Sequence, residues 1–249
     1  MRIPATLFAA CAVLFFVANV QQPHHSHWSY SGAEGPAHWA QLDHSYATCS
    51  DGHAQSPIDI KDAKPADLPP LQFDYGAAPQ SIVNNGHTIQ VTFGAGNTLR
   101  VGDKTYTLKQ FHFHHPSEET IDGRHSDMVM HLVHDDGNGH LAVVAVLFKV
   151  GAANPALDAV WSRMPRESGK TVELSGAALR LADLLPADRG YYSYSGSLTT
   201  PPCSEGVTWY VLKTPLTLSS QQLAAFSKLY PHNARPTQPL SGRVVRQTS

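Results

Sequence analysis

The chain has 249 residues, which is enough for one large domain or two small ones with a substantial buried core. Charged residues make up only 15% of the sequence, and the formal net charge is -2 with no run of basic residues. This charge pattern argues against nucleic acid or an anionic membrane surface as a partner.

The first twenty residues have the pattern of a secretory signal peptide. Arg2 precedes an apolar run from Ile3 to Val20, and polar residues follow it. We expect residues 1–20 to be a signal with an undefined cleavage site, and residues 24–249 to form the folded domain. The run is short for a spanning helix, so no stable membrane association is expected after cleavage, and an uncleaved anchor is the alternative.

Three cysteines are present, and Cys11 falls inside the apolar run. That run continues past Cys11, which argues against a lipoprotein site. If Cys11 leaves with the signal, Cys49 and Cys203 remain, and two cysteines in an exported protein are the usual setting for one disulfide. We expect this bridge, and two unpaired buried thiols are the alternative.

Strands dominate the elements predicted along the chain. Residues 28–55 are expected to be irregular, with large aromatic rings packed on the body. Strands at 81–87 and 88–93 should be joined at Asn85-Gly86, a tight-turn dipeptide. Further strands are predicted at 98–101, 105–115, 128–134, 141–150 and 207–212. The segment 141–148 is continuously apolar and β-branched, which predicts a strand buried on both faces.

Three helices are predicted, at residues 154–164, 177–185 and 219–230. The first begins with a polar cap and Pro155, and the second is stopped by Pro186. No repeat or linker divides the chain after residue 24. The pattern therefore predicts one β-dominated domain with peripheral helices.

His112 and His114 are candidate metal ligands in the strand at 105–115. Alternate side chains of a strand share a face, so both imidazoles point the same way. With fifteen histidines in the chain this spacing also arises by chance, so a third ligand decides the matter. His131 lies in the apolar strand at 128–134, where a buried neutral imidazole needs a metal or a hydrogen-bond partner. The other candidates are His125, His134 and His140.

Three histidines on neighbouring strands would leave zinc one open tetrahedral position for water, which is typical of a catalytic site rather than a structural one. Around these residues the sequence resembles the alpha-class carbonic anhydrases, especially the exported bacterial members, from Trp28 to about Arg246. The matching segments are 27–30, 55–59, 85–87, 110–114, 117–118, 131–134, 141–143, 197–203 and 235–240.

The resemblance implies a mainly β single domain, built on a large, mostly antiparallel twisted central sheet with a few short peripheral helices and an active-site cleft over the zinc. It also implies a zinc-dependent lyase that hydrates carbon dioxide reversibly to bicarbonate and a proton by zinc-hydroxide attack. A proton-accepting buffer would take the released proton.

The resemblance also implies roles for individual residues. His112, His114 and His131 would bind zinc. Thr199 would accept the hydrogen of the zinc-bound hydroxide and pass its own hydrogen to Glu118, which orients the hydroxide toward the substrate. Cys49 and Cys203 match the disulfide common in exported members.

Further matches concern the proton and the substrate. His87 matches the family's proton shuttle, and without the resemblance it is an exposed turn histidine. Tyr30 and Gln90 match positions that order water, and Gln110 matches a residue that accepts a ring N–H from a ligand histidine. Thr200 would help to hold bicarbonate. The apolar wall for carbon dioxide would consist of Val133, Val143, Leu198, Val207 and Trp209.

One position departs from the family pattern. Val129 stands where the family usually has a glutamate that receives the ring N–H of the third ligand. We expect His131 to use a backbone carbonyl or water instead, and zinc to leave faster than from a Val129→Glu variant. Glu119 stands where many relatives have histidine, and as the neighbour of Glu118 it is a candidate to disturb that residue's hydrogen bonds.

Two alternative functions are a catalytically weak or non-catalytic carbonic-anhydrase-related binding domain and a zinc hydrolase acting on esters. The three histidines, together with Thr199 and Glu118, argue against the first, and no feature suggests a cleft for an acyl chain. The compact chain, without long insertions, most resembles bacterial members of the family, which favours the periplasm, with a secreted or membrane-anchored form as the alternative. The sequence does not define the oligomeric state.

Overall fold

The computed structural model describes residues 26–174 and 179–249. The predicted signal at residues 1–20, Cys11 and the start of the helix expected at 177–185 lie outside the described residues. Within the described part, no helix is both long enough and apolar enough to cross a membrane.

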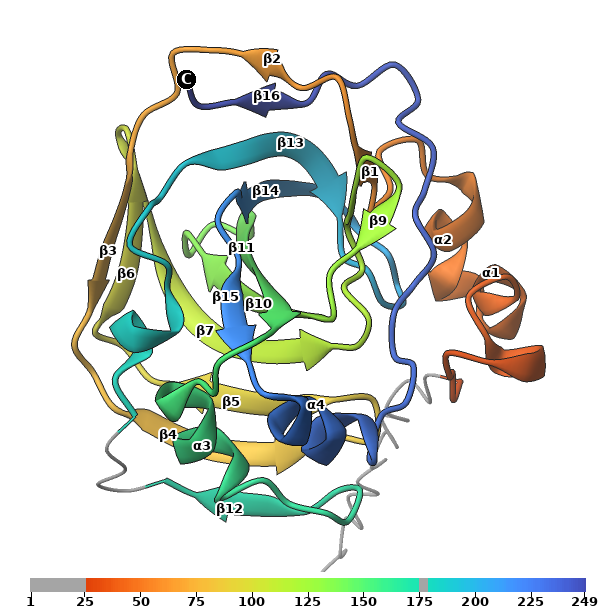
Figure 1. Cartoon of the computed structure of the whole chain (residues 1–249). Coiled ribbons are helices and arrows are strands. Elements are labelled where there is room, and N and C mark those ends of the chain that lie inside the picture. The colour runs from red at the N-terminus through yellow and green to blue at the C-terminus, as the bar shows by residue number, and fades with distance from the viewer. Residues whose placement is uncertain (1–25, 175–178) are drawn as a thin grey trace, which may run out of the picture.

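A large twisted sheet forms the body of the domain (Figure 1). Its main path runs through β12 (Thr171–Glu173), β4 (Pro79–Asn84), β5 (Ile89–Phe93), β7 (Lys104–His114), β10 (Met128–Asp135), β11 (Leu141–Val150), β14 (Glu205–Leu212), β13 (Tyr191–Ser197), β16 (Arg246–Gln247) and β2 (Lys64–Pro65). Off this path, β6 (Asn97–Val101) pairs with β7 and β3 (Leu71–Tyr75), and β15 (Leu216–Leu218) pairs with β11.

Most neighbouring strands are antiparallel. The exceptions in this sheet are β14 and β15, which run parallel to β11, and β16, which runs parallel to β2. A second, small sheet consists of β1 (Asp59–Ile60), β8 (Thr120–Ile121) and β9 (Arg124–His125). These observations confirm the predicted mainly β fold with a large, mostly antiparallel sheet.

The strand pattern predicted from the sequence is largely confirmed. The strands expected at 98–101, 105–115, 128–134, 141–150 and 207–212 correspond to β6, β7, β10, β11 and β14 within two residues. The predicted hairpin is β4 and β5, but its connection has four residues, 85–88, rather than two. The Asn85 side chain accepts from the backbone N–H groups of His87 and Thr88, at 2.9 Å each. These bonds stabilise the turn, and the pairing of the two strands ends at Asn84 and Ile89.

The faces of β10 separate two hydrophobic clusters. Met130 and its even-numbered neighbours belong to the larger cluster, whereas Val129 belongs to a smaller one that also contains Val143 and Trp209. Residues 142–148 of β11 are buried throughout, which confirms the prediction of a strand covered on both faces. The candidate metal ligands therefore lie on strands held rigid from both sides.

Two of the three predicted helices are present in shorter form. α3 (Pro155–Trp161) is capped by Asn154, whose side chain accepts from the Ala156 N–H at 3.0 Å, and α4 (Ser220–Ser227) begins with a capping box formed by Ser219 and Gln222. The prediction of a helix reaching Leu185 is wrong, because residues 179–185, the described part of this segment, contain only the 3-10 turn η3 (Leu181–Leu184). Leu181 and Leu184 are both buried, and a spacing of three residues places them on one side of such a turn.

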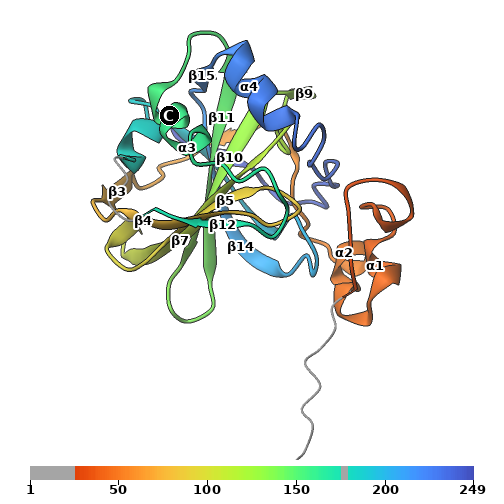
Figure 2. The ribbon, with the colours of Figure 1, turned by 90° about the horizontal axis from the view of Figure 1, so that it is seen from below.

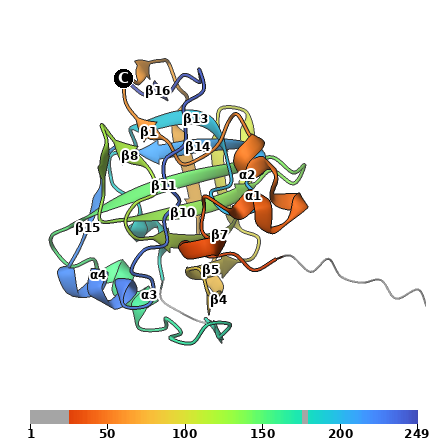
Figure 3. The same ribbon diagram turned by 90° about the vertical axis from the view of Figure 1, so that its right-hand side faces the viewer.

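The N-terminal segment, expected to be irregular, contains four short helical turns. These are η1 (Gly32–Glu34), α1 (Trp39–Leu42), η2 (His44–Tyr46) and α2 (Thr48–Asp51). Trp39 is fully buried in a cluster with Tyr46 and the two cysteines, so the segment is packed on the body as predicted. Figures 2 and 3 show α1 and α2 on a different side of the sheet from α3 and α4.

Candidate metal centre

Three histidines meet on one face of the paired strands β7 and β10. His131 lies directly opposite His112 in the ladder, and His114 lies opposite Val129. Side chains two residues apart share a face, so this register places all three imidazoles together. One ligand atom from each residue lies within 4.8 Å of the others.

Each of the three rings has one nitrogen engaged by an oxygen acceptor of the protein. The donors and acceptors are His112 Nδ1 to Gln110 Oε1 at 2.8 Å, His114 Nδ1 to the Asn233 carbonyl at 2.7 Å, and His131 Nε2 to Glu119 Oε1 at 3.0 Å. Because carbonyl and carboxylate oxygens only accept, these contacts fix which nitrogen carries the proton.

In the neutral form of each ring, the second nitrogen carries a lone pair that can bind a metal. His114 Nε2 is buried and has no hydrogen-bond partner among the described residues. A buried polar atom without a partner is costly, and a metal ion at this point would satisfy it. Three neutral imidazole nitrogens on one face fit zinc, and they leave one of its four tetrahedral positions open.

The electrostatic surroundings keep two of the rings neutral. Burial lowers the pKa of His112 to about 3, and burial together with His131 and His112 lowers the pKa of His114 well below its ordinary value. Burial also disfavours the charged form of His131, but the charge and hydrogen bond of Glu119 and the charge of Glu118 outweigh it, so its pKa is raised. Metal binding requires neutral imidazoles, so displacement of a proton would accompany binding at His131.

Glu118 lies buried beside the triad. Its Oε1 accepts from the backbone N–H of Arg235 at 2.8 Å and lies 3.5 Å from His114 Nδ1. Burial raises the pKa of Glu118 to about 7, although the charge of His131, the Arg235 N–H and the Thr199 side chain lower it in part. The Thr199 side chain is thus close enough to Glu118 to influence the pKa of its carboxyl group.

Glu119 supplies the hydrogen-bond acceptor for His131 that Val129, at the position departing from the family pattern, does not supply. The expectation that His131 uses a backbone carbonyl or water is wrong, because its Nε2 donates to the fully buried Glu119 carboxylate. Val129 is fully buried in the smaller hydrophobic cluster. The sequence showed both a missing and an additional glutamate, but only the fold shows that the second reaches His131.

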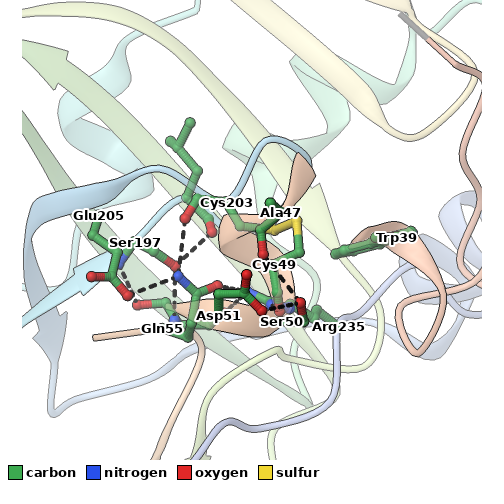
Figure 4. The surroundings of a disulfide bond; sticks show 12 residues. Trp39, Ala47, Cys49, Ser50, Asp51, Gln55, Ser197, Cys203, Glu205 and Arg235 are labelled. Carbon is green, nitrogen blue, oxygen red and sulfur yellow. Dashed lines mark hydrogen bonds between the residues drawn. A yellow bond between two sulfur atoms is a disulfide. The ribbon is translucent and has the colours of Figure 1, made fainter. Parts of the chain in front are cut away.

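The loop that carries Thr199 and Thr200 is tied down at both ends. The Leu198 N–H donates to the Ser204 carbonyl at 2.9 Å, and the Cys203 N–H donates to the Thr200 carbonyl at 2.8 Å. Thr199 is buried and Thr200 half-buried. The predicted disulfide between Cys49 and Cys203 is present and links this loop to α2 (Figure 4).

A buried arginine joins the disulfide region to the site, and the sequence analysis gave it no role. The Arg235 guanidinium donates to the Cys49 carbonyl at 3.0 Å and to Gln55 Oε1 at 2.9 Å (Figure 4). Asn233, two residues earlier, was missed as well. Its carbonyl holds His114, and its side-chain amide donates to the carbonyls of His87 and Phe113 at 3.0 Å each.

The five residues predicted to form the apolar wall belong to one hydrophobic cluster. Val143, Val207 and Trp209 are buried, and Val133 and Leu198 are half-buried against them. The Trp209 ring lies 4.9 Å from the His131 ring, measured between centroids. An apolar surface therefore adjoins the triad.

His87 is half-buried, with its ring stacked on Trp28 at 3.7 Å between centroids. Burial and the nearby His27 lower the pKa of His87. Burial and the charge of Glu118 raise the pKa of Tyr30 well above its ordinary value. Gln90 is half-buried and lies opposite His112 in the ladder between β5 and β7.

The other candidate histidines do not join the triad. His134 is buried on the opposite face of β10, where its Nε2 lies 2.6 Å from the Tyr75 hydroxyl. His125 and His140 are exposed, and His140 pairs with Asp136. His115 is half-buried, and its Nδ1 donates to the Asp127 carbonyl at 2.6 Å.

Comparisons with known proteins agree with this geometry. Residues 34–249 match the model of the eukaryotic-type carbonic anhydrase family. A carbonic anhydrase from Klebsiella pneumoniae is 49% identical over 223 residues, which cover 88% of this chain and 90% of the relative.

Solved structures give the same result. An alpha-carbonic anhydrase from Thermovibrio ammonificans, in complex with the inhibitor sulfanilamide, superposes with a TM-score of 0.86 at 48% identity and covers 89% of this chain and 99% of its own. The alpha-carbonic anhydrase of Photobacterium profundum superposes with a TM-score of 0.82 at 48% identity, covering 88% and 99%.

Proposed function

The chain belongs to the eukaryotic-type carbonic anhydrase family, a family of zinc enzymes, and we propose that it catalyses the reversible hydration of carbon dioxide to bicarbonate and a proton. The observation that carries this proposal is the triad of His112, His114 and His131. In each ring one nitrogen donates to a protein oxygen, and the ligand atoms of the three residues converge within 4.8 Å. Carbon dioxide and bicarbonate would be substrate and product.

The three histidines would hold zinc through His112 Nε2, His114 Nε2 and His131 Nδ1, the nitrogens that make no hydrogen bond to a protein acceptor. When bound, zinc supplies a Lewis acid that lowers the pKa of a coordinated water toward neutrality. Gln110 and the Asn233 carbonyl fix the tautomer and orientation of two of the rings.

Thr199 and Glu118 would set the direction of hydrogen bonding at the open position. Glu118 is held by the Arg235 N–H, so its carboxylate presents an acceptor to the Thr199 hydroxyl. A hydroxyl that donates to a carboxylate must act as an acceptor toward its other neighbour. Thr199 thereby selects the orientation of the attacking oxygen, which is catalysis by positioning.

The apolar wall would hold carbon dioxide, an uncharged molecule, against the triad without competing hydrogen bonds. Val143, Val207 and Trp209 supply its buried part. The half-buried Thr200 would hold bicarbonate through its hydroxyl and backbone. Burial of apolar side chains next to the reacting centre also excludes water that would otherwise occupy the substrate position.

His87 would pass the released proton to buffer. A ring with lowered pKa is neutral at pH 7 and can accept a proton, and partial exposure allows transfer to buffer. Tyr30 stays protonated because its pKa is raised, so together with Gln90 it can order water between the triad and His87.

We also propose that the protein is exported to the periplasm after removal of residues 1–20. The disulfide between Cys49 and Cys203 supports an oxidising compartment. Fractionation of cells, followed by N-terminal sequencing of the mature protein, would test the proposal. Recovery of an uncleaved, cytoplasmic chain would overturn it.

The proposed activity is tested by metal analysis and stopped-flow hydration of carbon dioxide. We expect about one zinc per wild-type chain and loss of both zinc and activity in His114→Ala. His134→Gln is the matched control, because His134 is equally buried, on the neighbouring strand β10, but faces away from the triad. Folded wild-type protein that neither retains zinc nor hydrates carbon dioxide would refute the proposed function.

A further inference from the structure

His131 differs from the other two ligand histidines in what holds its ring. His112 and His114 donate to neutral acceptors, a side-chain amide and a backbone carbonyl. His131 donates from Nε2 to the carboxylate of Glu119 at 3.0 Å. A carboxylate is the stronger acceptor, and it makes the ring a better metal ligand as well as fixing its orientation.

The Glu119 side chain has no other described role. It is fully buried, and its second oxygen, Oε2, has no hydrogen-bond partner among the described residues. Burying a carboxylate is unfavourable unless it is paired, and the hydrogen bond to His131 is the pairing that the described residues provide. Its neighbour Glu118 is engaged separately, by the Arg235 N–H.

The backbone around Glu119 is fixed by several contacts. The Ser117 hydroxyl donates to the Glu119 carbonyl at 2.6 Å and accepts from the Ser126 N–H at 2.9 Å. The next residue, Thr120, begins β8 and donates through its hydroxyl to Asp59 at 2.7 Å. The carboxylate is therefore delivered to His131 by an anchored loop.

Position 129, two residues before His131 on the same face of β10, does not supply an acceptor. Val129 is fully buried among apolar side chains that include Val143 and Trp209. A carboxylate at position 129 would be buried in this apolar cluster, and the Nε2–H of His131 already donates to Glu119. Position 129 on β10 therefore contributes to the hydrophobic cluster, and the acceptor for His131 comes from Glu119 in the preceding loop.

We propose that Glu119 is the positioning residue that orients His131 for zinc, taking the part that the family pattern assigns to position 129. The inference rests on the proposed function, since it concerns retention of the catalytic metal. It replaces the expectation that Val129→Glu would slow the release of zinc.

The test measures release of zinc to an excess chelator from the zinc-loaded protein. We expect Glu119→Ala to release zinc about 10- to 100-fold faster than wild type, and Glu119→Gln, which keeps a neutral acceptor, to lie between the two. Glu205→Gln is the matched control, because this glutamate accepts from Gln55 and the Ala54 N–H and has no contact with the triad. Release from Glu119→Ala within twofold of wild type would overturn the proposal.

Two further measurements separate positioning from a general structural role. In zinc-loaded protein the His131 ring N–H should give a low-field proton resonance that moves to higher field in Glu119→Gln but not in Glu205→Gln. Val129→Glu alone should release zinc no more slowly than wild type. An unmoved resonance in Glu119→Gln, or clearly slower release from Val129→Glu, would show that Glu119 does not hold the ring.

The outcomes distinguish this inference from the proposed function. Folded wild-type protein that binds no zinc would refute the function itself. Wild-type protein that holds zinc, with release unchanged in folded Glu119→Ala, would refute only the role of Glu119. Circular dichroism and thermal unfolding of the metal-free variants establish folding, and the isosteric Glu119→Gln variant supplies the comparison if Glu119→Ala does not fold.

Discussion

Removal of the disulfide should lower the free energy of unfolding by about 5 kcal/mol. The bridge joins Cys49 to Cys203, 154 residues further along the chain. In the chain-entropy treatment, closing a loop of this length removes about 17 cal/mol/K from the unfolded state, which is about 5 kcal/mol at 25 °C. Since native disulfides contribute roughly 2–5 kcal/mol in practice, this figure is an upper value.

Removal of the disulfide should also disturb the candidate site without causing loss of the metal. The Cys203 N–H closes the loop on the Thr200 carbonyl, and the Cys49 carbonyl accepts from Arg235, whose backbone holds Glu118. The three histidines lie on β7 and β10, and neither strand carries one of the two cysteines. We therefore expect zinc content to be unchanged and kcat to fall.

The assay compares wild type with Cys49→Ala/Cys203→Ala in guanidinium titrations of the zinc-loaded proteins. Reductant should destabilise the wild type and leave the double variant unaffected, which controls for effects of the substitutions themselves. A loss below about 1 kcal/mol, with unchanged denaturant dependence, would refute the loop-entropy reasoning.

Three further predictions concern single residues. Thr199→Ala should lower kcat/KM roughly 100-fold in stopped-flow assays while zinc content stays constant, and Thr199→Ser should retain most of the activity; equal activity of all three proteins would contradict the positioning role. His87→Ala should lower turnover but spare kcat/KM, and added imidazole should restore turnover; no rescue would argue against a shuttle. Burial lowers the pKa of His134 to about 4 from an ordinary value of 6.5, so the unfolded state binds the proton first. The stability that neutral His134 provides is therefore complete above pH 6.5 and is lost as the pH falls toward 4, by roughly 3 kcal/mol. Urea titrations across this range should show a smaller acid loss in His134→Gln, and an equal loss would contradict the assignment.

Local pattern was sufficient for much of the fold. The apolar run at 141–148 is rich in β-branched residues, which favour a strand, and its lack of polar alternation indicated burial on both faces. Asn154 and Ser219 marked the beginnings of α3 and α4, since both side chains cap free N–H groups. In the same way, the spacing of His112 and His114 placed both rings on one face of a strand.

Other strands had no local signal. β13 (Tyr191–Ser197) contains three serines and a glycine and was not predicted, yet it pairs with β14 along its whole length. The short strands β1, β2, β12 and β16 were missed for the same reason. Their pairing energy comes from neighbours far away in the chain, which a window of local sequence does not contain.

The candidate site likewise has residues that the sequence indicates and contacts that only the fold establishes. The sequence by itself indicated the three histidines, Thr199, Glu118 and the two cysteines, because each belongs to a segment that resembles the family. Only the tertiary structure brought the Glu119 carboxylate, from the loop after β7, within hydrogen-bond distance of His131 on β10, and the Arg235 N–H to Glu118. A hydrogen bond requires two atoms about 3 Å apart, and that proximity is set by strand register and loop packing rather than by residue type or spacing.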